Sequence, residues 1–210
     1  MKKNNDNPWS PRKVAEAHGY FSNLDEASSH HEPFASFIED KEDARIVDIG
    51  CGNGRVLNNL NTYSKYLGID TCKELISLSE KHFKDNDKAS FLTMDIEKDV
   101  WPKIMSDYNV AYFDSTFEML EDPLSLLKKI TEIFETVFFL RLRIFDLGEI
   151  DAEKGSNKWE GMEEDSPCWK FSKSFFDNFS SSHGGNFKII SSQSHPYITD
   201  HKTCVAVYER

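Results

Sequence analysis

The apolar residues of this chain fall into short runs that are separated by longer stretches with helical spacing. Five runs predict buried strands, and they lie at residues 45–50, 66–70, 90–94, 109–113 and 136–145. Residues 72–83 carry apolar side chains at helical spacing, and a second helix is predicted after Asp122, because a capping aspartate is followed there by proline. Residues 55–60 also predict the start of a helix. This alternation is typical of an α/β fold, with helices on both faces of a mostly parallel sheet.

The two ends of the chain depart from this alternation. Residues 187–194 and 203–209 predict two strands that form an antiparallel hairpin at the C-terminus. The first 43 residues are mostly polar, although Phe34, Phe37 and Ile38 have the spacing of one helix face. We therefore expect an N-terminal cover over residues 1–43 and one α/β domain over residues 44–210.

Composition and charge narrow the range of functions. The chain has 210 residues, of which 39% are hydrophobic, and this fits a single globular domain. Its 25 basic and 36 acidic residues give a net charge of −11, which disfavours nucleic acid as a partner. The four cysteines form no Cys-x-x-Cys pair, so no metal site or disulfide framework is indicated. No apolar stretch is long enough to cross a bilayer, and no signal peptide is recognisable, so a cytoplasmic protein is expected.

The turn after the first predicted strand carries the candidate binding chemistry. Asp48 stands near the end of the strand, and Gly50, Gly52 and Gly54 follow at every second position. In a parallel sheet such a turn lines the crevice at the carboxyl ends of the strands, where ligands bind. Arg55 stands where a dinucleotide-binding fingerprint needs its third glycine, and no Gly-Lys-Ser or Gly-Lys-Thr follows. Both of these glycine-rich phosphate loops are therefore excluded.

The arrangement resembles motif I of the class I S-adenosylmethionine-dependent methyltransferases, and the likeness extends over roughly residues 45–144. The resemblance implies a Rossmann-like sheet of seven strands in the order 3-2-1-4-5-7-6. It also implies S-adenosylmethionine as cofactor and S-adenosylhomocysteine as product. Asp70 matches the acidic residue that binds the ribose hydroxyls in this family, and Asp95 matches the one that takes the adenine amino group.

Several residues are assigned to the cofactor by this resemblance, and they are Asp48, Gly50, Cys51, Gly52, Gly54, Asp70, Thr71, Asp95, Ile96 and Asp114. Each aspartate also has a plain structural interpretation. Asp70 and Asp95 are of a residue type that often ends strands, and Asp48 could cap the following helix. Their register with the glycine loop favours cofactor binding.

The sequence departs from the family's pattern where a general base is often found. Met119 occupies the place at which many small-molecule members carry a histidine, and the Pro-Pro-aromatic step of nucleic-acid amino-methylating members is absent after Asp114. Methyl transfer from a sulfonium leaves a neutral thioether, so positioning can supply much of the catalysis without a base. The candidate catalytic residues are His18, Asp114 and His195, although an isolated surface histidine is usually only solvated.

Two arginines and an insertion point to the acceptor. Arg141 and Arg143 alternate in the fifth predicted strand and are expected on one side of the sheet near its carboxyl end. They either pair with acids of the following segment or hold an anionic acceptor, because a guanidinium binds phosphate or carboxylate bidentately. Residues 146–167 form an insertion where the family often places acceptor-binding elements. Trp159 either lines an acceptor pocket or anchors this loop, and Tyr20 is expected to close over the cofactor on the acceptor side.

These observations favour a methyltransferase that acts on oxygen or nitrogen of a small metabolite, with a phosphorylated or carboxylated acceptor as one form. RNA or protein methylation is an alternative that needs a basic groove or a docking surface. A non-catalytic S-adenosylmethionine-binding module is a further alternative. It would explain the missing histidine and the absence of the Gly-Gly pair that the family usually carries before the fifth strand. The expected partner is a small-molecule acceptor, and the oligomeric state is left open.

Overall fold

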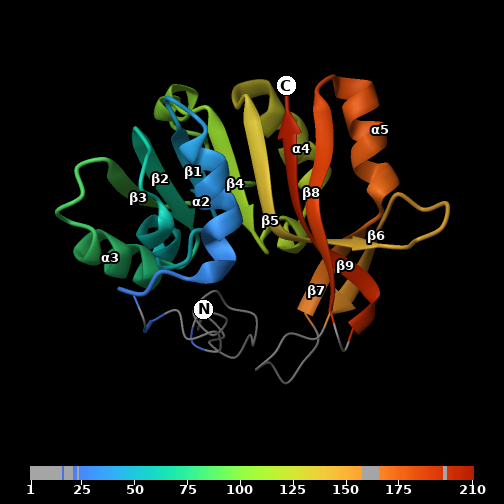
Figure 1. The fold of residues 1–210 in the computed structure, drawn as a ribbon, viewed down its shortest axis with the longest axis horizontal. Coiled ribbons are helices and arrows are strands. Elements are labelled where there is room, and N and C mark those ends of the chain that lie inside the picture. Colours follow the sequence, from blue (N-terminus) through green and yellow to red (C-terminus); the bar gives the residue numbers. More distant parts are fainter. Residues whose placement is uncertain (1–15, 17–20, 23, 158–165, 196–197) are drawn as a thin grey trace, which may run out of the picture.

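The computed structural model describes residues 16, 21–22, 24–157, 166–195 and 198–210, and Figure 1 shows a twisted sheet flanked by helices. Five strands form the parallel part of the sheet. They run in the order β3 (Ala89–Thr93), β2 (Lys65–Asp70), β1 (Arg45–Ile49), β4 (Val110–Asp114) and β5 (Thr136–Phe145). Strand order therefore reverses beside β1, which places the turns after β1 and β4 at the position where such sheets bind ligands.

The C-terminal hairpin is confirmed. The strands β8 (Asn186–His195) and β9 (Ile198–Glu209) pair antiparallel with each other, and β9 also pairs antiparallel with β5. The register of β5 on β9 shifts between Phe139 and Leu142, where Arg141 has a backbone φ of +56°. This bulge interrupts the two-residue alternation of β5, so the sequence pattern alone does not fix where Arg141 and Arg143 point.

The sheet has nine strands, and the expectation of seven is corrected by the structure. The additional hairpin consists of β6 (Ala152–Asn157) and β7 (Ser166–Phe171), and β7 joins the carboxyl end of β5 through Ile144 and Phe171. It begins within the insertion predicted at residues 146–167 and extends beyond it to Phe171. Residues 152–157 contain no apolar run, so the sequence carries no strand signal there.

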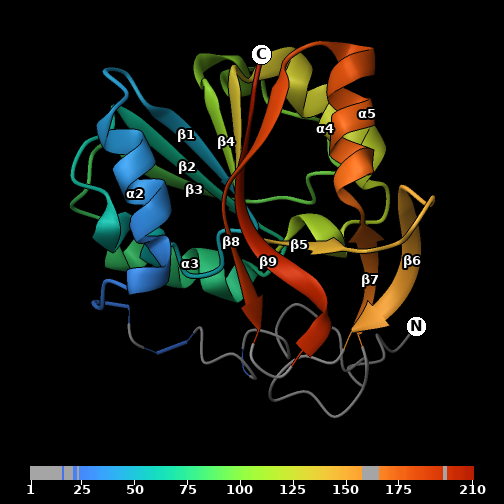
Figure 2. The same cartoon turned by 45° about the vertical axis from the view of Figure 1, so that its right-hand side comes forward.

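Helices cover both faces of the sheet, as Figure 2 shows. The helix α2 (Glu32–Glu39) buries Phe34 and Ile38 on one face, where the Phe34 ring stacks on the Tyr112 ring at 3.9 Å between centroids. The helices α4 (Pro123–Ile133) and α5 (Lys173–His183) bury their apolar sides on the other face. The helix α3 (Lys73–His82) packs beside β2 and β3. The partition of the chain at residues 43 and 44 stays a prediction.

The remaining short elements are 3₁₀ turns, namely η1 (Ser29–His31), η2 (Arg55–Asn59), η3 (Lys103–Asp107) and η4 (Phe117–Met119). The predicted helix start at residues 55–60 is therefore only a 3₁₀ turn. Here Asn58 donates a side-chain hydrogen bond to the carbonyl of Leu24, and Asn59 donates one to the carbonyl of Ser28. These side chains anchor the N-terminal stretch beside the glycine loop. Among the described residues, no helix has the length and apolar character that a membrane crossing requires.

Candidate functional site

The glycine loop after β1 is tightly packed between two other strand ends. The backbone N–H groups of Gly50 and Cys51 both donate to the carbonyl of Ile69, at 2.8 and 3.0 Å. Gly50, Gly52 and Gly54 have φ values of +78°, +56° and +70°. A Cβ atom on Gly50 would lie 2.5 Å from the side chain of Thr116, so both backbone conformation and space require glycine at this position.

Asp70, at the end of β2, faces this loop. One carboxylate oxygen accepts the N–H of Gly52 at 2.9 Å, and the other accepts the N–H of Cys72 at 2.8 Å. Burial raises the pKa of Asp70, although these backbone donors oppose the rise. A carboxylate offers about four lone-pair sites, so Asp70 keeps acceptor capacity for further hydrogen bonds. The adjacent Thr71 is exposed.

Asp95 follows β3, and its carboxylate binds groups of the turn that comes after it. One of its oxygens accepts the N–H groups of Glu97 and Lys98, at 3.1 and 3.3 Å, and the ammonium of Lys98 lies 3.5 Å from the other oxygen. Ile96 is 6% exposed and belongs to the core. Asp95 therefore lies at the strand end where it was expected, with part of its hydrogen-bonding capacity used locally.

Asp48 and Asp114 end neighbouring strands but have opposite surroundings. Asp48 is 3% exposed, accepts a hydrogen bond from the Tyr66 hydroxyl at 2.6 Å, and has its pKa raised to about 8 by burial. Asp114 is held by a fork from Arg141, whose Nε and terminal nitrogen lie 2.6 and 2.9 Å from its two oxygens. Burial opposes ionisation of Asp114, but hydrogen bonds from His30 and Arg141 and the charge of Arg141 outweigh it, so its pKa lies below the ordinary value. An ionised carboxylate engaged in this way is a weak proton acceptor.

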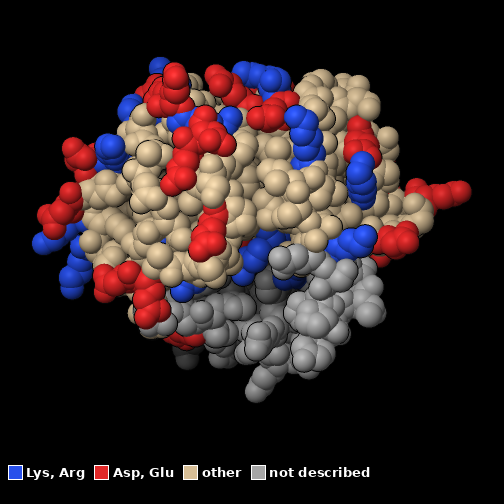
Figure 3. Space-filling view, viewed as in Figure 1, with Lys and Arg blue, Asp and Glu red and all other residues tan. Residues whose placement is uncertain are grey.

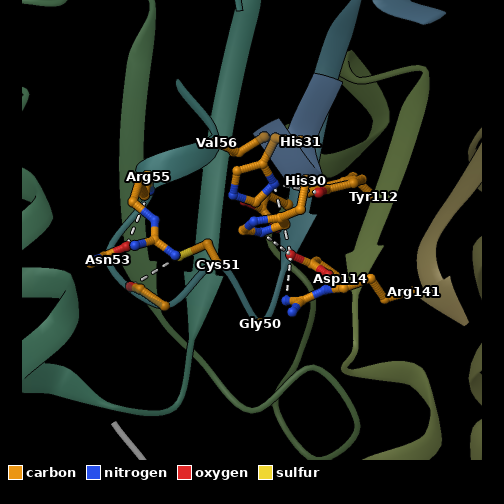
Figure 4. Close-up of a pocket in the computed structure, with 12 residues that line it drawn as sticks. His30, His31, Gly50, Cys51, Asn53, Arg55, Val56, Tyr112, Asp114 and Arg141 are labelled. Atoms are coloured by element: carbon orange, nitrogen blue, oxygen red, sulfur yellow. Dashed lines mark hydrogen bonds and ion pairs between the residues drawn. The ribbon is translucent and has the colours of Figure 1, made fainter. Parts of the chain in front are cut away.

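Two histidines that sequence reasoning did not assign to the site lie against Asp114, as Figure 4 shows. The Nε2 atom of His30 is 3.4 Å from a carboxylate oxygen of Asp114, and Nδ1 of His31 is 3.8 Å from the same oxygen. The Nδ1 atom of His31 is also 3.1 Å from the Tyr112 hydroxyl. Burial lowers the pKa of His31 to about 3, so its imidazole is neutral near pH 7. The only sequence signal was the adjacency of the two histidines just before α2.

These side chains and the glycine loop line one pocket together with Arg55 (Figure 4). Arg55 begins the turn after the loop, and its Nε is buried without a hydrogen-bond partner among the described residues. Sequence reasoning used Arg55 only to exclude a dinucleotide fingerprint. The structure makes it a cation beside the loop with donor capacity left to bind an anionic group.

Four further residues predicted for the site lie outside the described ranges or at the end of a strand. His18, Tyr20 and Trp159 lie outside the described residues, and His195 is the last residue of β8. Arg143 is 14% exposed, and its Nε lies 3.6 Å from a carboxylate oxygen of the buried Glu118 in η4. Burial raises the pKa of Glu118, and the charge of Arg143 opposes that rise. Among described residues, the ion-pair partners of Arg141 and Arg143 are thus Asp114 and Glu118, which belong to β4 and the turn after it.

Comparison with protein families decides the class of protein. A family model described as a methyltransferase domain matches residues 20–179, which is most of the chain. The chain belongs to this methyltransferase family. A search of curated proteins found no significant match to the sequence of this methyltransferase.

Solved structures share the fold of this methyltransferase at low sequence identity. The N-terminal domain of EvdMO1, crystallised in the presence of S-adenosylhomocysteine and D-fucose, has a TM-score of 0.68 at 11% identity and covers 88% of this chain and 84% of its own. The plantazolicin methyltransferase BpumL, in complex with S-adenosylhomocysteine, has a TM-score of 0.61 at 16% identity. The match covers 96% of this chain and 91% of BpumL. The magnesium protoporphyrin IX methyltransferase ChlM of Synechocystis PCC 6803, with bound S-adenosylmethionine, has a TM-score of 0.57 at 8% identity. The match covers 95% of this chain and 82% of ChlM. The fold is thus that of class I methyltransferases.

Proposed function

We propose that this methyltransferase binds S-adenosylmethionine across the carboxyl ends of β1, β2 and β4 and transfers its methyl group to oxygen or nitrogen of a small metabolite. The observation that carries the proposal is the position of Asp70, whose carboxylate faces a loop of three glycines with positive φ at the reversal of strand order. A partly buried carboxylate beside such a loop can accept hydrogen bonds from both ribose hydroxyls.

Arg55 and the residues around Asp114 support a site for the methionine end of the cofactor. That end carries a carboxylate and an ammonium. Arg55 supplies a cation with an unused donor, and Asp48 and Asp114 supply oxygens in the same pocket. Asp95 and Ile96 are proposed for the adenine, at the end of β3. When bound, the cofactor supplies an electrophilic methyl group on a sulfonium, and the residues of the pocket orient it and exclude water.

The proposed acceptor is small, and a polymer acceptor is not favoured by the surface charge. The chain carries a net charge of −11, and Figure 3 shows acidic and basic side chains interspersed on the face in view rather than gathered into a basic stripe. A polyanion such as RNA would have to bind against the overall field. Arg143 is proposed to hold an anionic group of the acceptor. Its contact with Glu118 is longer than a hydrogen bond, so a phosphate or carboxylate can compete for it.

Calorimetry with S-adenosylhomocysteine tests the proposal. Asp70→Asn should weaken binding by about ten-fold or more, because a hydrogen bond to a charged acceptor contributes about 1.5–3 kcal/mol. Asp177→Asn, the same change on the exposed side of α5, should leave binding unaltered and serves as the matched control. No measurable binding to the unmodified protein, or equal affinities for both variants, would overturn the proposal.

The acceptor is tested on the same preparations by following transfer of a radiolabelled methyl group to a metabolite panel. Arg143→Met should reduce transfer to phosphorylated and carboxylated acceptors while leaving binding of S-adenosylhomocysteine intact. Equal transfer by the variant and by the unmodified protein would remove the anionic acceptor, and no transfer to any panel member would argue for a non-catalytic module.

A further inference from the structure

His30, His31 and Asp114 bring three potential metal ligands together at one wall of the pocket. Each side chain offers one ligand atom, and these atoms all lie within 4.8 Å of one another. Two of them approach the same carboxylate oxygen of Asp114, at 3.4 Å from His30 and 3.8 Å from His31. We propose that these three side chains bind a divalent transition-metal cation. The cation would share Asp114 and the pocket wall with the proposed site for the methionine end of the cofactor, but its binding does not require the cofactor.

The distances are close to those of a real metal site. Metal–ligand bonds of about 2.0–2.2 Å place two tetrahedral ligands about 3.4 Å apart. The pair formed by His30 and Asp114 already has this separation, and the pair formed by His31 and Asp114 is slightly wider. His30 is partly exposed, so its ring can close the remaining gap without rearranging the core.

The outer contacts of His30 are those that orient a metal ligand, whereas the Tyr112 hydroxyl lies 3.1 Å from Nδ1 of His31 and must give up that atom to the cation. A histidine ligand usually donates its second ring N–H to a neighbouring acceptor, which fixes the tautomer. The Nδ1 atom of His30 lies 2.5 Å from the hydroxyl of Ser28, leaving Nε2 for the cation. Ser28 is itself fixed, because its backbone N–H donates to the side chain of Asn59 at 3.1 Å and its carbonyl accepts from that side chain at 3.0 Å.

Arg141 is compatible with this role of Asp114. Its fork uses one lone-pair site on each carboxylate oxygen, and a carboxylate has about four such sites. Carboxylates that bind metals are commonly hydrogen-bonded by other groups in this way. Two imidazoles and one carboxylate suit Zn²⁺, Co²⁺, Fe²⁺ or Mn²⁺ and leave at least one coordination position open toward the pocket.

A Co²⁺ titration of the chelator-treated full chain, followed by visible absorption, tests the site. We expect one Co²⁺ per chain, and we expect His30→Phe to lower the affinity at least 100-fold, since it keeps a ring but removes the ligand. Ser28→Ala should lower the affinity about 10- to 100-fold, which is the usual effect of losing an outer contact of a metal ligand. His82→Phe should bind as the unmodified protein does, because His82, at the end of α3, forms a similar but separate pair with Asp25.

Three results would overturn the proposal. They are no binding at one equivalent of Co²⁺, a near-ultraviolet thiolate band that places the metal on cysteine, and equal affinity for the unmodified protein and His30→Phe. The Ser28→Ala variant keeps all three ligands, so it separates loss of the site from misfolding. Calorimetry with S-adenosylhomocysteine on the same samples shows whether cofactor binding survives, so failure here is distinguishable from failure of the proposed function.

Discussion

At the scale of single residues, Asp48 and Asp114 show how surroundings decide the chemistry of one residue type. Both stand at strand ends in the same pocket, yet burial raises the pKa of Asp48 to about 8 while partners hold that of Asp114 below its ordinary value. Near pH 7 Asp48 is therefore mainly protonated and Asp114 ionised. A neutral carboxyl can donate a hydrogen bond, whereas an ionised one only accepts.

Asp48 makes the stability of the protein depend on pH. Its pKa is about 8 in the folded protein and 3.8 as a free group, so between these values only the folded chain retains the proton. The contribution of Asp48 to the free energy of unfolding is fully present below pH 3.8. It falls as the pH rises toward 8, by up to about 1.4 kcal/mol per pH unit. The variant Asp48→Asn, which keeps an oxygen for Tyr66, should lose this dependence.

Urea unfolding of both proteins between pH 5 and pH 9 measures the effect. The free energy of unfolding of Asp48→Asn, relative to that of the unmodified protein, should increase with pH up to about 8 and then level off. A difference that is constant across this range would contradict the burial of an uncharged Asp48.

At the scale of elements, local sequence and distant contacts contribute differently to the helices and strands that hold the site. The helix α4 begins where it was expected, because Asp122 accepts the N–H of Ser125 at 3.1 Å and Pro123 occupies the first turn. The strand β5, by contrast, bends at a bulge with Arg141 in the left-handed region. That bend brings the guanidinium of Arg141 to the carboxylate of Asp114. It could not be anticipated from the alternation of side chains along a regular strand.

The N-terminal cap of α4 contributes measurably to the free energy of unfolding. Asp122→Ala removes the side-chain acceptor of the Ser125 N–H at the start of this helix and should lower the free energy of unfolding by about 1 kcal/mol. Asp122→Asn keeps a capping oxygen and should change it by only a few tenths of a kcal/mol. Equal losses in both variants, measured by urea unfolding, would show that the cap is not the cause.

At the scale of the whole molecule, the excess of acidic residues acts on the folded state. A net charge of −11 concentrated in a compact chain repels itself, and the unfolded chain relieves that repulsion. Salt screens such interactions, because the Debye length falls from about 30 Å at 0.01 M to about 8 Å at 0.15 M.

The thermal unfolding midpoint at pH 8 should therefore rise when NaCl is raised from about 10 to 150 mM, across the range where the Debye length shortens most. The same addition at pH 5, close to the isoelectric point of about 5.1, should have little effect, because the net charge is then near zero. A midpoint that does not move at pH 8, or that moves equally at both values, would contradict self-repulsion as the cause.

The sequence by itself determined the parallel strands β1 to β5, the C-terminal hairpin and the position of the glycine loop with Asp70. These features depend on short-range patterns: apolar runs mark strands, and glycines mark a loop that needs positive φ. The family resemblance rested on the same residues, and the family match confirmed it.

Only the tertiary structure decided the rest of the site. His30 and His31 are distant in sequence from Asp114, and they meet it because α2 packs its apolar side on β4 and β5. The hairpin formed by β6 and β7 joins the sheet because β7 pairs with β5, although β6 has no apolar run of its own. Contacts of this kind depend on how elements pack across the chain, and a local pattern of residues carries no record of them.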